Sequence, residues 1–398
     1  MTRSRRAAHG NRIEPLPDFL RAETAGGIVL FVATLAALVW ANGPGAETYQ
    51  RLWQIRVTAP LGPLARTEDL RHWMNEGLMA LFFFVVGLEI KRELVIGELS
   101  STRKAALPVI AAFAGVVTPA AIFLAIVGGG PAARGWGIPI ATDIAFAVGV
   151  LALSRRVCGG VKLFLLSVAV VDDVIAIMVI ALFYSAPIAW GWLAIGTAGL
   201  VLVTIMRRLG VHAVWPYVPV GLIVWLATHE SGVHATIAGV ALALLVPARP
   251  FRGRDVLGEL EHRLHPVSAF VVIPLFAVAN AGVDLRGGVL ADAMGSSLTW
   301  AVVVGLFAGK IIGISGATVL AVRTGLARTP DGMRLGDVWG VAALAGIGFT
   351  VSLFIAGLAF DSVHLIGQAK VGIFIGSLAS AVIGTALLSV RCRPAGRH

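Results

Sequence analysis

Residues 165–184 read LLSVAVVDDVIAIMVIALFY, and this stretch decides how the chain must fold. As a helix it is long enough to cross the hydrocarbon core of a bilayer, which takes about 20 apolar residues. Its only charged residues are Asp172 and Asp173, near the middle. The stretch therefore predicts a membrane helix that carries two adjacent acidic side chains far from water.

The composition of the whole chain agrees with this prediction. Of 398 residues, 57% are hydrophobic and only 14% are charged, and the mean hydropathy is +0.86. Soluble domains carry about 25% charged residues. Hydrophobicity this high excludes a disordered chain, and two cysteines exclude a disulfide framework or a zinc ribbon. The fold class predicted is an all-α polytopic membrane protein.

Twelve segments are predicted to be transmembrane helices. They are residues 24–41, 72–90, 105–127, 138–153, 163–184, 188–206, 214–228, 232–247, 266–284, 298–322, 338–359 and 371–390. The pair 214–228 and 232–247 is the least regular, because His229, Glu230 and Ser231 interrupt it and each half is short.

The distribution of basic residues predicts the orientation. With a cytoplasmic N-terminus, 24 of the 32 Lys and Arg residues fall on the cytoplasmic side and 7 on the other. Such a bias is typical of membrane proteins. It places both termini in the cytoplasm, and it explains the net charge of +10 without a nucleic-acid partner.

The outer loop at 45–66 has a strand-like pattern. Trp53, Ile55 and Val57 alternate with polar residues, and Gly62-Pro63 supplies a turn. We expect a small extracytoplasmic β-hairpin, whose exposed edge would be able to pair with a second copy of the chain. An irregular loop is the alternative.

The chemistry that the sequence predicts centres on the pair Asp172 and Asp173. Two adjacent carboxylates in a medium of low dielectric constant resist ionising together unless a cation is present, and they titrate as one coupled unit. Such a site can hold protons or an alkali cation, which is the chemistry of ion exchange. The alternative is a carboxylate pair neutralised by a buried base for stability.

Two further charged residues lie inside predicted spans. Asp143 follows Pro139 in GWGIPIATDIAFAVGVLALS, residues 135–154, so we expect the helix to break near 138–142 and the buried charge of Asp143 to mark the transport path. The alternative, which is compatible with transport, is that Asp143 caps the restarted helix. Lys310, in WAVVVGLFAGKIIGISG, is the only lysine inside a predicted span and a natural partner for the aspartate pair. The alternative for Lys310 is a side chain that reaches an interface.

The chain shows signs of internal symmetry. Glycines interrupt GVAALAGIGFTVSLFIAGLAF, residues 340–360, around Phe349 and Thr350. Spans three to five (105–184) and ten to twelve (298–390) thus each have an interrupted middle helix, and they enter the membrane from opposite sides. Paired interruptions in inverted three-helix repeats point to a binding site at the membrane midplane of a secondary transporter.

A series of motifs resembles the NhaA-type sodium/proton antiporters, which are themselves a known example of such repeats. The motifs are GLEIKREL (87–94), IPIATDIAFAVGVLAL (138–153), VVDDVIAI (170–177), GVHATIAG (232–239), LEHRLHP (260–266), IPLFAVANAGV (273–283), GKIIGI (309–314) and GIGFTVSLFIA (346–356). The resemblance runs from about residue 19 to the C-terminus.

The resemblance implies a two-part architecture in a bacterial inner membrane. Core repeats at 105–184 and 298–390 would carry the discontinuous, crossing helices, and interface helices would occupy 24–104 and 188–297. The cytoplasmic tails would be 1–23 and 391–398, and the 45–66 hairpin would join two copies in a homodimer.

The resemblance also implies roles for single residues. Asp173 would be the principal Na⁺ and H⁺ ligand and Asp172 its partner, with Thr142, Asp143 and Lys310 supporting the site. No cofactor is expected. Candidates for a pH sensor are Glu89, Arg92, Glu93, Glu261, His262 and His265 in a cytoplasmic funnel, with His234 on the outer side. Glu98, Asp255 and Glu259 look equally suitable from sequence alone.

We therefore expect an electrogenic, pH-regulated exchanger of external H⁺ for internal Na⁺ or Li⁺, and not an enzyme. One alternative is a transporter of an organic anion. Another is an intramembrane aspartyl protease with Asp143 and one of the paired acids as its dyad. A third is a subunit of a larger proton pump.

Overall fold

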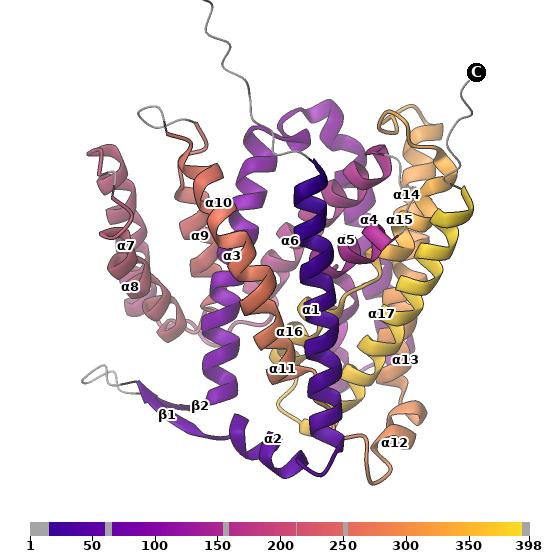
Figure 1. Cartoon of the computed structure of the whole chain (residues 1–398), viewed down its shortest axis with the longest axis horizontal. Helices are drawn as coiled ribbons and strands as arrows, with labels where there is room; N and C mark the ends of the chain where they lie inside the picture. The colour runs from indigo at the N-terminus through magenta and orange to yellow at the C-terminus, as the bar shows by residue number, and fades with distance from the viewer. Residues whose placement is uncertain (1–15, 60–65, 154–158, 212, 250–253, 392–398) are drawn as a thin grey trace, which may run out of the picture.

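The fold is a bundle of helices with one small sheet at one end (Figure 1). A computed structural model describes residues 16–59, 66–153, 159–211, 213–249 and 254–391. The expected terminal tails lie mostly outside these residues, as does the predicted turn at Gly62-Pro63.

The first half of the chain contributes the following elements: α1 (Leu16–Asn42), α2 (Ala46–Trp53), β1 (Arg56–Ala59), β2 (Arg66–Asp69), α3 (Leu70–Val95), η2 (Glu98–Ser100), α4 (Thr102–Val127), η3 (Pro131–Ile140), α5 (Ile144–Leu153), α6 (Gly159–Phe183) and α7 (Trp190–Arg208).

The second half continues with α8 (Tyr217–Glu230), α9 (Thr236–Leu245), α10 (Val256–Val267), η4 (Ser268–Val272), α11 (Ile273–Asn280), α12 (Val289–Gly295), α13 (Ser297–Val304), η5 (Gly305–Gly309), α14 (Lys310–Arg323), η6 (Leu335–Asp337), α15 (Val338–Ala345), α16 (Phe349–Ala359) and α17 (Val363–Arg391). Here η4 and η5 are single π-helical turns within longer helices, whereas η2, η3 and η6 are 3₁₀ segments.

The helices differ in whether they are long and apolar enough to span a membrane. Seven are long and apolar enough to cross a bilayer, or nine if each of two bent pairs forms one span, among the residues that the structure describes. Each of the twelve predicted spans overlaps one helix, or two or three consecutive helical elements. However, α8 and α9 have only 14 and 10 residues, so twelve spans remains a prediction.

The outer segment at 45–66 differs in part from its expected form. Strands β1 and β2 pair antiparallel, with Arg56 opposite Asp69 and Thr58 opposite Thr67. Residues 46–53 are not part of this hairpin, because they form the helix α2. This helix buries Tyr49 and Trp53, and the Tyr49 hydroxyl donates to the Val278 carbonyl at 2.8 Å.

Two helical segments are broken inside the bundle. The axis bends by 44° between η3 and α5, and by 47° between α15 and α16. The two breaks lie against each other: a Cβ atom added at Gly348 would come within 3.0 Å of the Ala141 carbonyl oxygen. Glycine therefore permits the close crossing of the two interrupted segments.

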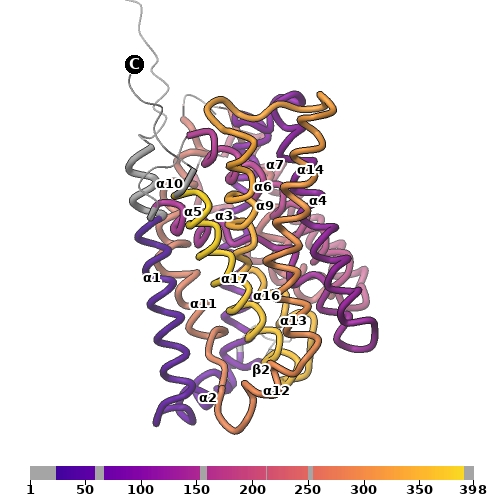
Figure 2. The backbone as a smooth tube through the Cα atoms, turned by 90° about the vertical axis from the view of Figure 1, so that its right-hand side faces the viewer, coloured from indigo at the N-terminus to yellow at the C-terminus, as the bar shows by residue number. Residues whose placement is uncertain are grey.

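The neighbouring helices enclose this crossing. α4 packs on α6 and α14, and α17 packs on α13, α15 and α16 (Figure 2). On the other side of the bundle, α1 packs on α5 and α11, and α3 packs on α9. Much of the buried apolar core, including Ile138, Val341 and Ile347, surrounds the breaks.

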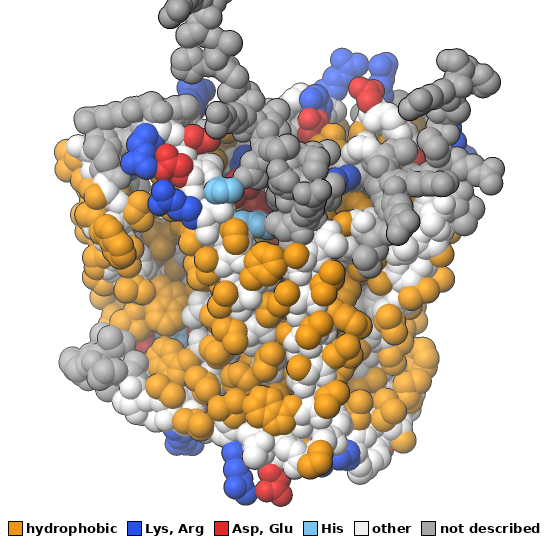
Figure 3. All heavy atoms as spheres, in the orientation of Figure 1, with side chains coloured by type: hydrophobic (Ala, Val, Ile, Leu, Met, Phe, Trp, Pro, Cys, Tyr) orange, Lys and Arg blue, Asp and Glu red, His pale blue; other side chains and the backbone are white. Residues whose placement is uncertain are grey.

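The surface shows a wide band of hydrophobic side chains, with charged side chains gathered at the two ends of the bundle (Figure 3). Large apolar side chains such as Leu182, Leu222 and Leu320 are exposed on single helices. A surface of this kind suits contact with lipid hydrocarbon rather than water.

Candidate functional site

The site is built on hydrogen bonds between the two broken segments. The Asp143 backbone N–H donates to the Ile347 carbonyl at 2.6 Å, and the Ser352 hydroxyl donates to the Ile138 carbonyl at 2.7 Å. Backbone groups freed at a break must find partners inside the protein, since lipid offers none. Here each break supplies partners for the other.

Asp143 joins the starts of two half-helices. Its Oδ1 accepts from the Phe146 backbone N–H at 3.0 Å, which caps α5. Its Oδ2 accepts from the Thr350 backbone N–H at 3.0 Å and from the Thr350 hydroxyl at 2.5 Å, at the start of α16. A carboxylate at two helix N-termini is favoured by both helix dipoles.

Asp172 and Lys310 form a fully buried ion pair. The Lys310 Nζ lies 2.5 Å from Asp172 Oδ2, and both side chains have an exposed fraction of 0%. Thr142 completes the cluster: its hydroxyl lies 2.7 Å from Asp172 Oδ2 and 2.8 Å from the Ala345 carbonyl, and it accepts from Lys310 at 3.2 Å. The hydroxyl has one proton for the two acceptors, so one of these contacts is a hydrogen bond at any moment.

The second oxygen of Asp172 is not part of this network. Among the described residues, Asp172 Oδ1 has no hydrogen-bond partner, although it is buried. A buried acceptor without a donor is costly. A proton or a cation at this oxygen would remove that cost.

Asp173 has a different environment from its neighbour in the chain. It is only 3% exposed, and it lines a small cavity of about 40 Å³ together with Thr142 and Ile144. The same cavity is lined by Glu89 of α3 and by His265 of α10. The aspartate pair is thus divided: Asp172 is bound to a lysine, and Asp173 faces a space large enough for a water molecule or a small ion.

Comparison with known proteins identifies the family of the chain. The model of the family described as Na⁺/H⁺ antiporter 1 matches residues 17–388. The chain belongs to this family. The resemblance to NhaA-type antiporters is therefore confirmed.

Individual relatives cover nearly the full length. The chain is 48% identical to Na(+)/H(+) antiporter NhaA 1 of Erythrobacter litoralis, over 94% of this chain and 92% of that protein. It is 44% identical to the NhaA antiporter of Escherichia coli O139:H28, over 95% and 99% of the two chains. The fold is also similar to that of the sodium proton antiporter MjNhaP1 from Methanocaldococcus jannaschii, with a TM-score of 0.53 at 15% identity, over 94% of this chain and 98% of that one.

Membership of this family rejects one alternative from the sequence. The relatives are transporters, so the chain is not an enzyme. The geometry agrees, because both oxygens of Asp143 are engaged as helix caps rather than facing a second aspartate in a dyad.

At one end of α3, the structure brings together five of the residues considered for pH sensing. Arg92 Nη1 lies 2.6 Å from Glu261 Oε1, and Arg92 Nη2 lies 3.4 Å from Glu93 Oε1. His265 Nε2 lies 4.0 Å from Glu89 Oε1. We call Glu89, Arg92, Glu93, Glu261 and His265 the α3–α10 cluster. Two of its members, Glu89 and His265, also line the cavity that Asp173 lines.

Two other candidates lie apart from these contacts. His234 bonds to the Tyr184 carbonyl at 2.6 Å, in the turn before α9, and His262 is exposed on α10. The remaining acids are engaged locally: Glu98 pairs with Lys104 at 3.2 Å, Glu259 pairs with Arg254, and Asp255 caps α10.

Sequence reasoning missed part of the site. Thr350 was noted only as a residue at the glycine-rich interruption, although it binds Asp143 through two groups. A hydroxyl directly after a helix break was the available signal. The description of Lys310 as the only lysine within a span was wrong, because α6 and α17 begin earlier than predicted and bury Lys162 and Lys370.

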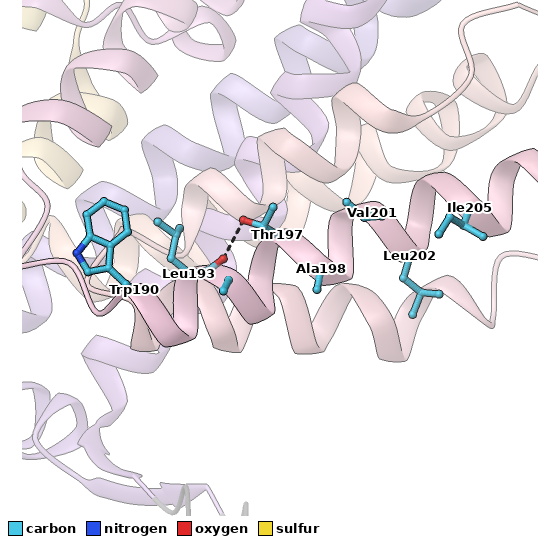
Figure 4. A pocket seen from close by; sticks show the side chains of 8 residues that line it. Trp190, Leu193, Thr197, Ala198, Val201, Leu202 and Ile205 are labelled. Atoms are coloured by element: carbon cyan, nitrogen blue, oxygen red, sulfur yellow. Dashed lines mark hydrogen bonds between the residues drawn. The ribbon is translucent and has the colours of Figure 1, made fainter.

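A shallow hollow on α7 is unsuited to ion binding (Figure 4). Its lining comes from one face of that helix and is apolar except for Thr197, whose hydroxyl donates to the Leu193 carbonyl at 2.8 Å. Such a face suits lipid.

Proposed function

We propose that this chain exchanges internal Na⁺ or Li⁺ for external H⁺ across a bacterial inner membrane. Its family and its relatives, which are named as Na⁺/H⁺ antiporters, support the exchange. The observation that carries the proposal is the division of the aspartate pair: Asp172 contacts Lys310, and Asp173 lines a cavity.

Competition for carboxylate oxygens would be the chemical basis of exchange. Asp173 is the principal ligand in this proposal. Thr142, which lines the same cavity, and Asp172, whose Oδ2 lies 2.7 Å from the Thr142 hydroxyl, would contribute further oxygen atoms. An alkali cation and a proton both neutralise the same buried charge, so one displaces the other. With either bound, the site escapes the cost of an uncompensated buried carboxylate.

The ammonium group of Lys310 would compensate the charge of Asp172 while no Na⁺ is bound. While Lys310 holds Asp172, that carboxylate is compensated without Na⁺. Arrival of Na⁺ would compete with this contact and free Asp172 to bind the ion. The oxygen Oδ1, which has no hydrogen bond with the described residues, is the atom best placed to take part.

Exchange of this kind moves net charge. Two carboxylates can carry two protons inward and one monovalent cation outward. The cycle would then be driven by the membrane potential as well as by the proton gradient.

Alternating access would come from motion of one part of the bundle against the other. We assign 105–184 and 298–390 to a core with inverted repeats, and 24–104 and 188–297 to an interface part. The hydrogen bonds between the two breaks support movement of the core as one unit, because they tie both half-helix pairs together.

The α3–α10 cluster would regulate exchange by pH. It combines acids, an arginine and a histidine, and two of its members, Glu89 and His265, line the cavity of Asp173. Histidine titrates near neutral pH. Protonation there would change the charge that a cation meets on its way to Asp173.

The remaining parts of the proposal concern assembly and orientation. The β1–β2 hairpin would join two copies into a homodimer through its open edge. The ends of the chain would lie in the cytoplasm, as the distribution of basic residues predicts.

Purified protein in proteoliposomes tests the exchange. A pH gradient is imposed, and proton flux is followed after addition of Na⁺, Li⁺ or K⁺. We expect Na⁺ and Li⁺ to drive flux, Asp173→Asn to abolish it, and Asp292→Asn, a change in the exposed helix α12, to leave it unchanged.

Retention of wild-type flux by Asp173→Asn would contradict the assignment, and an equal response to K⁺ would remove the selectivity for Na⁺ and Li⁺. Uptake of a labelled organic anion that is independent of Na⁺ would favour the organic-anion alternative. Flux by the protein purified alone would dismiss a role as a pump subunit.

A further inference from the structure

A second cluster of ionisable side chains lies far from the aspartate pair, where α3 begins and α8 ends. His72 and Glu76 are four residues apart on α3 and share one face of that helix. His229 lies at the end of α8. One ligand-type atom from each of the three side chains lies within 4.8 Å of the other two.

The burial and hydrogen bonding of this cluster are those of a preformed binding site. Glu76 is 6% exposed, and its Oε2 lies 3.7 Å from His229 Nδ1. Neither His72 Nε2 nor Glu76 Oε2 makes a hydrogen bond with the described residues, although both atoms are buried. A ligand bound between these side chains would supply the hydrogen-bond or coordination partners that the two buried atoms lack among the described residues.

Trp225 of α8 contacts residues on both helices of the cluster. The Trp225 ring stacks on His229 at a centroid distance of 6.2 Å and an angle of 10°. The Trp225 indole N–H also donates to the Glu76 carbonyl at 3.3 Å. Trp225 therefore holds the His229 ring beside the part of α3 that carries Glu76.

We propose that His72, Glu76 and His229 form a binding site for a transition-metal dication of the Zn²⁺ class. Two imidazoles and one carboxylate, with a fourth position open, are a donor set that Zn²⁺ takes. Its ligand bonds of about 2.0–2.2 Å place tetrahedral ligand atoms roughly 3.4 Å apart. Side-chain rotations that move each ligand atom by about 1 Å would bring the three atoms to that separation.

The site is separate from the cavity that Asp173 lines. Glu76 and Glu89 lie on the same helix, and 13 positions at 1.5 Å per residue put them about 20 Å apart. The start of α3 follows β2, at the hairpin end of the bundle (Figure 1). A bound metal would therefore tie α3 to α8 at that end without touching Asp173.

Spectroscopic metal binding tests the site independently of transport. Full-length protein in detergent, with any affinity tag removed, is titrated with Co²⁺, and the visible absorption of four-coordinate Co²⁺ is recorded. Zn²⁺ is then added to displace it. The variants are His72→Leu and His229→Leu, and the matched control is His364→Leu, which removes a histidine of α17.

We expect the wild type and the His364→Leu control to bind one Co²⁺ that Zn²⁺ displaces, and Zn²⁺ to raise the Tm of both. Each of the other two variants should bind Co²⁺ at least tenfold more weakly and lose the Tm shift, while its Na⁺-driven proton flux shows that it is folded. Should either variant fail to fold, Glu76→Gln takes its place. Equal Co²⁺ affinity in the wild type and in these variants would overturn the proposal, as would equal loss in the control.

Discussion

The aspartate–lysine site and the α3–α10 cluster use similar residues in opposite environments. In the aspartate–lysine site, Asp143, Asp172 and Lys310 are at most 2% exposed, and they bind one another or neighbouring groups of the broken segments. In the α3–α10 cluster, the Arg92 side chain is 41% exposed although it pairs with a nearly buried Glu261. The comparison teaches that a charge buried away from water depends on its partner, whereas water can replace the partner of an exposed charge.

The largest effect is expected from Lys310→Met. It leaves Asp172 as a buried charge without its cation, and breaking a buried pair from one side costs about 3–5 kcal/mol of unfolding free energy. The measurement is thermal unfolding of the purified variant in detergent.

The double variant Lys310→Met with Asp172→Leu sharpens this test. We expect it to recover most of the lost stability, because no uncompensated charge remains, but not to recover Na⁺-driven flux. Equal stability of the single variant and the wild type would show that the midplane pair is not desolvated.

The next effect is expected from Asp143→Ala. This change removes the caps of α5 and α16 together, and at about 1 kcal/mol for a typical cap the loss should be about 2 kcal/mol. Thermal unfolding measures it, with Asp255→Ala, which removes the cap of α10 alone, as the control. If the two variants lost the same stability, Asp143 would not serve both half-helices.

A smaller effect on stability is expected from Arg92→Gln. A partly exposed pair contributes at most about 1 kcal/mol. Loss of the positive charge should shift the pH profile of exchange toward more alkaline values, because the neighbouring carboxylates then lose their protons less readily. The readout is flux in proteoliposomes over a series of pH values. A pH profile identical to that of the wild type would show that the α3–α10 cluster does not regulate exchange.

The smallest effect is expected from His262→Gln. His262 lies on α10 but is exposed, so solvent screens its charge. The pH profile of exchange of His262→Gln should resemble that of the wild type more closely than the profile of His265→Gln does. In the wild type, the His265 side chain lies 4.0 Å from Glu89. A larger shift for His262→Gln than for His265→Gln would reverse the assignment.

The sequence allowed the core of the site to be predicted, because its signals are local. Acids in a long apolar stretch pointed to Asp172 and Asp173, and Pro139 pointed to the break before Asp143. The bond between Thr350 and Asp143 joins residues 207 positions apart, and nothing local in either segment encodes it. Lys162 was placed in a loop because helix boundaries are uncertain by several residues.

The hairpin shows another limit. Alternation of apolar and polar residues predicted strands over a range that includes α2. Tertiary contacts decide this segment, since Tyr49 and Trp53 are buried on one face of a helix. The sequence pattern indicates that these side chains are buried, but it does not show whether they are buried on a strand or on a helix.

The central claim is that protons and Na⁺ compete for the buried carboxylates. Calorimetric titration of the purified protein with Na⁺, in buffers of different ionisation enthalpy, measures the protons released on binding. The account predicts proton release, a Na⁺ affinity that falls as the pH is lowered, and loss of both in Asp173→Asn. Na⁺ binding without proton release and with the same affinity at every pH would contradict it.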